Sequence, residues 1–187
     1  MATVTLDQPL PATRFESERL FEIVKGERRE KQPMSVLAIA VASALAEFLS
    51  AFVRNHKLGW VVVEMLFQLR ADRPQRRPDL AFVSYLRGRM PPPDEDVPAW
   101  SVVPNLAVEV ISPTNMANEV MGKVLEYIDA GVDWVWVIYP VQQCIQVFDS
   151  RATSRILWPG DELDGGRVLP GFRLGVRELF ESIANPQ

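Results

Sequence analysis

Hydrophobic residues recur with two different spacings along this chain, and the spacing predicts where helices and strands lie. Between residues 34 and 55 they fall every three or four positions, which marks one face of a helix: Leu37, Val41, Ala44, Leu45, Phe48 and Phe52. Ser35 stands before this stretch as a plausible N-cap. Two further helices are predicted, over about residues 115–130 and 176–183.

Strands are predicted where β-branched and aromatic residues form short runs. Such runs cover residues 60–69, 80–85, 106–111 and 133–140, and alternation marks 144–148. Residues 20–32 predict a hairpin with a turn at Lys25-Gly26 and a charged second strand. Shorter strands are predicted near 154–158 and 167–169, and loops over 70–77 and the proline-rich 87–104.

The order of these elements predicts an α/β fold. A helix that connects the strands at 106–111 and 133–140 makes those two strands parallel, whereas the three earlier strands can form a meander. The result is a mixed β-sheet flanked by helices, in which ligands gather at strand ends near the crossover. We expect residues 1–14 to form a flexible N-terminal arm and residues 15–187 to form one domain.

Composition narrows the possible functions. The net charge is −4 and the sequence pI is about 5.1, which argues against a protein that coats nucleic acid but leaves room for a local basic groove. One cysteine, Cys144, and one histidine, His56, exclude an internal disulfide and a Cys/His zinc site. We expect a cytoplasmic protein with no membrane partner, because no signal peptide is evident and no apolar run approaches about 18 residues, so that nothing is expected to span a membrane.

The candidate chemistry centres on Glu109, the one charged residue in the apolar strand at 106–111. A lone buried carboxylate costs several kcal/mol unless it is paired, protonated or bound to a cation. Asp79 opens a neighbouring strand, and two adjacent carboxylates most often persist because a divalent cation lies between them, here Mg²⁺ or Mn²⁺. Lys123, flanked on one helix face by the supporting residues Glu119 and Tyr127, could stabilise developing negative charge. Together these residues indicate phosphodiester hydrolysis.

Structural explanations exist for each of these residues. Asp79 follows Pro78 as a turn residue would, and Glu109 could pair with Arg77 or Lys123 in a salt bridge. Lys123 could equally be a surface residue that supports its own helix through i, i+4 pairs. Glu22, in the first strand of the hairpin, could be a further metal ligand or an exposed acid.

A DNA substrate would require local positive patches, because the whole chain is acidic. The hairpin offers one such patch, Lys25, Arg28, Arg29 and Lys31. The loop that leads into Asp79 offers another, Arg70, Arg73, Arg76 and Arg77. The second patch is favoured by its position beside the acidic pair, although both could be solvated loop charges. Cleavage of two strands usually needs two sites, so a homodimer is expected.

Five segments of this chain resemble one family of known proteins. They are FEIVKGE (21–27), RPDLAFV (77–83), PNLAVEVISP (104–113), GKVLEYIDAGVDWVWVIYP (122–140) and VLPGFRLGVRELF (168–180). In this order they are similar to the Uma family of "putative restriction endonucleases", within the PD-(D/E)XK nuclease superfamily, and together they span residues 20–180. The resemblance implies a restriction-endonuclease-like sheet with an N-terminal β-hairpin, a C-terminal β extension and a short helix.

The resemblance also implies roles for single residues. Asp79, Glu109 and the backbone carbonyl of Val110 would bind the metal, and Glu22 matches an acid that the family keeps in its opening hairpin. Position 111, where the superfamily usually has its lysine, is isoleucine here, so Lys123 would supply that amine from the helix. The expected function is a Mg²⁺-dependent DNA endonuclease. The alternative is a catalytically silent protein of the same fold that binds nucleic acid or serves as a structural module.

Overall fold

A six-stranded mixed sheet with helices on both faces forms the body of the protein. The computed structural model describes residues 20–69, 74–92 and 97–184, so the predictions for residues 1–14 and for Arg70 and Arg73 lie outside the described residues. The strand order is β10-β9-β8-β7-β6-β3. Their bounds are β3 Gly59–Val63, β6 Leu80–Ser84, β7 Leu106–Val110, β8 Trp134–Tyr139, β9 Cys144–Phe148 and β10 Ser154–Leu157.

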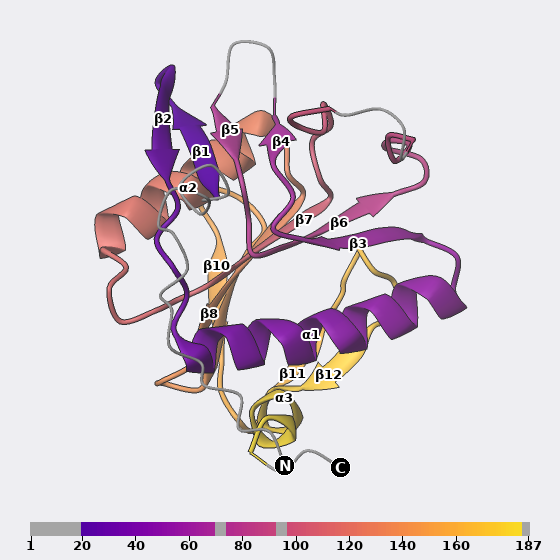
Figure 1. Ribbon diagram of the computed structural model, residues 1–187. Coiled ribbons are helices and arrows are strands. Elements are labelled where there is room, and N and C mark those ends of the chain that lie inside the picture. Colours follow the sequence, from indigo (N-terminus) through magenta and orange to yellow (C-terminus); the bar gives the residue numbers. More distant parts are fainter. Residues whose placement is uncertain (1–19, 70–73, 93–96, 185–187) are drawn as a thin grey trace, which may run out of the picture.

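The connection through α2 (Ala117–Ala130) explains why the sheet is mixed. β7 and β8 are parallel across this helix, as predicted, while every other pair of neighbours in the sheet is antiparallel. Side chains alternate along β6, so that Phe82 packs toward α1 (Val36–Asn55) and α3 (Val176–Ser182), whereas Val83 packs toward α2. The predicted α/β architecture is therefore confirmed (Figure 1).

A second, smaller sheet lies on the α2 side of the molecule (Figure 1). Its strand order is β2-β1-β5-β4, with bounds β1 Phe21–Val24, β2 Glu27–Glu30, β4 Phe67–Gln68 and β5 Gln75–Arg76. The predicted hairpin is confirmed: Lys25 and Gly26 have φ angles of 53° and 80°, as a two-residue turn between antiparallel strands requires. The salt bridge of Arg76 with Glu126 ties this sheet to α2.

Three sequence predictions about strands and loops are wrong. The loop predicted at 70–77 contains β5, which pairs with β1 and β4. The strand predicted at 60–69 is interrupted at Glu64, whose φ of 52° turns the chain out of the main sheet, so that β4 joins the smaller one. The strand predicted at 167–169 is a connection between β11 (Glu162–Asp164) and β12 (Arg173–Gly175). Leu169 is buried there without being in a strand, so its apolar character reflects core packing.

Helix α1 begins after Ser35, whose hydroxyl accepts a hydrogen bond from the Ala38 amide at 3.2 Å, as its N-cap role predicted. Within the described residues, α1 is long and apolar enough by length and composition alone to cross a membrane, a test that the core helix of a folded domain also passes. The prediction that no apolar run approaches about 18 residues was therefore wrong, because Glu47 and Arg54 are the only charged residues among the 20 of α1. Its buried face packs on the main sheet through Ala38, Val41, Ala42, Leu45, Leu49 and Val53.

Candidate active site

The register of β6 and β7 brings Asp79 and Glu109 together. Leu80 lies opposite Val108, so the next pair along the two strands is Asp79 and Glu109. Asp79 Oδ2 accepts a hydrogen bond from the Val110 amide at 2.6 Å, which fixes the carboxylate against β7. Both acids are buried, with exposed fractions of 3% and 6%. The structure thus places side by side the two acids that the sequence suggested as a pair.

Helix α2 supplies the immediate partners of Glu109. Lys123 Nζ lies 3.1 Å from Glu109 Oε2 and 3.3 Å from Oε1, and the Tyr127 hydroxyl donates to Oε1 at 2.7 Å. Tyr127 and Lys123 are one helical turn apart, so both reach the same carboxylate. Burial raises the pKa of Glu109, Lys123 opposes this shift, and the charge of Asp79 adds to it. The salt bridge with Lys123, considered from the sequence, is therefore present.

Glu22 joins the hairpin to the same cluster. Its Oε2 lies 2.7 Å from Arg76 Nη1, and its Oε1 lies 3.2 Å from Lys123 Nζ and accepts the Arg77 amide at 3.0 Å. Burial alone would raise the pKa of Glu22, but Lys123 and then Arg76 outweigh burial, so the pKa is lowered. Glu22 is thus a buried, ionised partner of two basic side chains, unlike the exposed acid considered from the sequence.

The arginines expected to contact DNA phosphates occupy different environments. Arg76 is buried, and its guanidinium binds Glu22 and Glu126, the second through Nε at 2.6 Å. Arg77 donates to the backbone carbonyls of Phe21 and Glu64. Arg76 therefore belongs to the buried ion-pair network, and although it lines the cavity, its guanidinium is already paired with two carboxylates.

Lys31 has a role that the sequence did not reveal. Its ammonium group lies 2.6 Å from Asp79 Oδ1 and 2.6 Å from Glu64 Oε2, and its side chain is 9% exposed. From the sequence it was one of four hairpin residues proposed for phosphate contact. One signal was available: the two-residue turn pairs Glu22 with Arg29, so strand alternation places Lys31 on the same hairpin face as Glu22.

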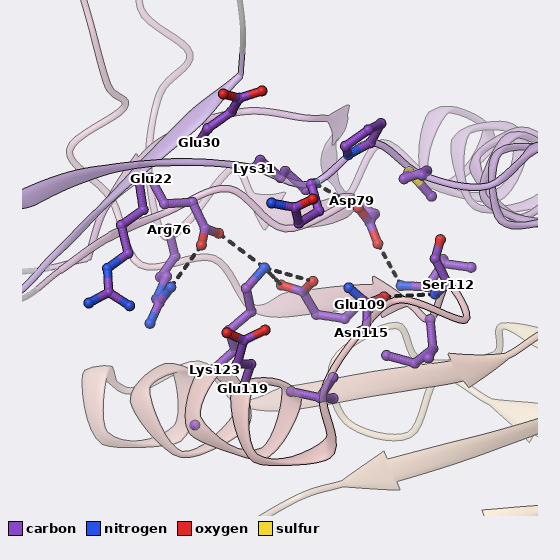
Figure 2. Close-up of a pocket in the computed structure, with 18 of the residues that line it drawn as sticks. Glu22, Glu30, Lys31, Arg76, Asp79, Glu109, Ser112, Asn115, Glu119 and Lys123 are labelled. Carbon is purple, nitrogen blue, oxygen red and sulfur yellow. Dashed lines mark hydrogen bonds and ion pairs between the residues drawn. The ribbon is translucent and has the colours of Figure 1, made fainter.

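One cavity of about 380 Å³ lies between the hairpin, the ends of β6 and β7, and α2, and it is lined by Glu22, Lys31, Asp79, Glu109 and Lys123 among others. Figure 2 shows Lys31 reaching Asp79 from one side and Lys123 reaching Glu109 from the other. Glu119 also lines the cavity and is exposed, at its rim. Ser112, after β7, accepts a hydrogen bond from the Ser35 amide at 2.9 Å, which links this wall to the start of α1.

The donor set fits a metal held by few protein ligands. Among the residues that the structure describes, no group of three or more His, Cys, Asp or Glu side chains could hold an ion. Mg²⁺ often binds through one or two carboxylates and completes its shell with water and substrate phosphates. Asp79 and Glu109 can provide such a pair once basic partners move aside, because the oxygens of both acids, like those of Glu22, already contact basic groups, a hydroxyl or a backbone amide.

The fold and this cluster define a protein of the restriction-endonuclease-like class. The family model described as "Putative restriction endonuclease", Uma2, matches residues 6–177, and the chain belongs to that family. A crystal structure described as "a putative nuclease belonging to DUF820 from Anabaena variabilis" has the same fold, with a TM-score of 0.78 at 17% identity. The match covers 94% of this chain and 99% of that one. A search of curated proteins found no match.

Proposed function

We propose that this protein is a Mg²⁺-dependent endonuclease that hydrolyses phosphodiester bonds of DNA. The observation that supports this most directly is the pair of buried acids, Asp79 and Glu109, opposite each other at the end of β6 and β7. Lys123 contacts one of them within a cavity large enough for a phosphate group. Membership of the Uma2 family, whose description names a nuclease activity, agrees with this chemistry.

In this proposal each residue has a defined task. Asp79, Glu109 and the backbone carbonyl of Val110 would hold Mg²⁺, which when bound supplies an activated water and charge stabilisation at the phosphate. Lys123 keeps Glu109 oriented and offers its charge to the reacting phosphate. Tyr127 fixes the second oxygen of Glu109. Glu22 contacts Lys123 and would position it.

Substrate contacts would come from the hairpin face that borders the cavity. Arg29 lines the cavity, its side chain is 58% exposed, and it lies on the same face as Glu22 and Lys31. It can therefore bind a phosphate beside the acidic pair, whereas the guanidinium of Arg76 is already paired with Glu22 and Glu126. Cleavage of both strands would use two copies of the chain, so a homodimer is part of the proposal.

A catalytically silent protein is the second candidate, and one observation favours it. The carboxylates of Asp79, Glu109 and Glu22 are all bound by Lys31, Lys123 or Arg76. A closed network of this kind can serve stability alone. Under this alternative the fold would bind nucleic acid or act as a structural module without turnover.

Nicking of supercoiled plasmid in Mg²⁺ separates the two candidates. We expect the wild type to nick, EDTA to stop the reaction, and Asp79→Asn and Lys123→Met to lower the rate by about 100-fold or more. Lys57→Met, an exposed lysine distant from the cavity in the fold, is the charge-matched control and should retain the wild-type rate. A folded wild type that does not nick, or an Asp79→Asn variant that nicks as fast, would favour the silent module.

A further inference from the structure

Lys31 occupies the position at Asp79 that a metal ion would need. The Asp79 carboxylate has two oxygens: Oδ2 is held by the Val110 amide and Oδ1 by Lys31 Nζ, each at 2.6 Å. The side chain of Asp79 is 4% exposed, so bulk solvent offers it little else. A cation that binds Asp79 through Oδ1, the oxygen not held by the β7 backbone, meets the ammonium group that already lies there (Figure 2).

The two cations repel each other at that oxygen. Mg²⁺ binds carboxylate oxygens at about 2.0–2.1 Å, which would put it within a few ångströms of an ammonium that is 2.6 Å from the same atom. Repulsion between cations at that separation is strong in a site shielded from water. We propose that Lys31 is a built-in counter-ion which competes with the divalent cation for Asp79, so that metal binding requires Lys31 to be displaced. This inference rests on the proposed metal site.

The position of Lys31 in the fold allows such a displacement. It follows β2, the edge strand of the smaller sheet, whose four residues Glu27–Glu30 are all exposed. Glu64, its other partner, is 23% exposed and can keep the ammonium group as it moves away from Asp79. The displaced amine borders the 380 Å³ cavity in which a phosphate would lie. Nucleic acid and metal would then each favour the binding of the other, because a phosphate stabilises Lys31 away from Asp79.

Calorimetric titration of Mn²⁺, without nucleic acid, tests the competition directly. Lys31→Met removes the ammonium group and keeps most of the side-chain volume. We expect it to bind Mn²⁺ about tenfold or more tightly than the wild type. Lys25→Met, at the exposed hairpin turn, makes the same change in net charge and should leave the affinity unchanged. Equal or weaker binding by Lys31→Met, or a gain of the same size in Lys25→Met, would overturn the proposal.

Amine labelling of the wild type tests displacement without any variant that could fail to fold. Brief acetylation followed by peptide mass spectrometry reports the accessibility of each lysine. We expect Lys31 to react slowly without metal and several-fold faster in saturating Mn²⁺, while exposed Lys25 and Lys57 react equally in both. Unchanged labelling of Lys31 at saturation would overturn the proposal. Neither measurement uses turnover, so failure of the nuclease proposal in the plasmid assay is recognised separately.

Discussion

Replacing Tyr127 with phenylalanine removes a single hydroxyl group from the most buried part of the candidate site. The ring is fully buried and packs in the core beneath α2, and phenylalanine keeps the ring in place. The variant therefore leaves no cavity larger than one oxygen atom. What it loses is the hydrogen bond donated to Glu109 Oε1 at 2.7 Å.

The size of the effect follows from the surroundings of Glu109. This carboxylate is 6% exposed, and without Tyr127 its described side-chain partner is Lys123, at 3.1 and 3.3 Å. A hydrogen bond to a charged group contributes about 1.5–3 kcal/mol, and a buried acceptor left unsatisfied pays its full desolvation penalty. We therefore expect Tyr127→Phe to lower the free energy of unfolding by about 1.5–3 kcal/mol.

Tyr139 provides a matched control within the same chain. Its hydroxyl donates to Gln146 Oε1 at 3.4 Å in a part-buried position, and neither residue is charged. Tyr139→Phe makes the same chemical change and should alter the free energy of unfolding by less than about 0.5 kcal/mol. Urea denaturation at pH 7 measures both variants. With a slope near 2 kcal/mol/M, the midpoint of Tyr127→Phe should fall by about 1 M.

The comparison has one outcome that would refute the reasoning. If Tyr127→Phe is no less stable than Tyr139→Phe at equal slope, then the hydroxyl of Tyr127 does not stabilise the Glu109 carboxylate. The picture of Glu109 as a carboxylate held by Tyr127 would then be wrong, and with it the support that this hydrogen bond lends to the proposed metal site.

Two other predictions concern stability. Burial would raise the pKa of Glu22, but the charges of Lys123 and then Arg76, together with the hydrogen bonds that Glu22 accepts, lower it overall. Ionised Glu22 therefore stabilises the folded state above its usual pKa of 4.5, and this stabilisation is lost as pH falls through the lowered value. Glu22→Gln should thus lower the free energy of unfolding by about 3 kcal/mol at pH 7. In urea denaturation, the difference in this free energy between wild type and variant should shrink below about pH 4.5, and a difference independent of pH would contradict the prediction. Gly59→Ala should cost several kcal/mol by thermal denaturation, because its Cβ would lie 2.1 Å from the Val83 carbonyl, whereas Gly160→Ala, with nothing within 4 Å, should be nearly neutral.

The fold was predictable where local pattern and tertiary environment agree. The periodicity of α1, the Lys25-Gly26 turn and the apolar run of β7 each carry enough information to place an element. Glu64 shows the opposite case, because nothing in its sequence neighbourhood favours a positive φ, and the break between β3 and β4 was missed. Two-residue strands such as β5 are defined by their partners, which a linear pattern does not contain.

The candidate site, like the fold, was predictable from the sequence only in part. Asp79 and Glu109 could be paired because adjacent strands and an out-of-place charge are visible in the chain. The pairing of Arg76 with Glu22 and that of Lys31 with Asp79 could not be predicted, because the members of these pairs are 54 and 48 positions apart in the sequence. Separations of that size bring charges together only through the tertiary fold, so the one signal for Lys31, its place on the hairpin face of Glu22, could not identify Asp79 as its partner.

The salt bridge between Glu22 and Lys123 has a consequence for the order of events during synthesis. Glu22, on the first strand, is made about 100 residues before its partner on α2, which at roughly 5–20 residues per second is a delay of about 5–20 s. Throughout that interval the nascent hairpin lacks the helix on which it will pack. The cluster of acids and bases is therefore completed only after most of the domain has left the ribosome, and a chain that stops before α2 cannot form it.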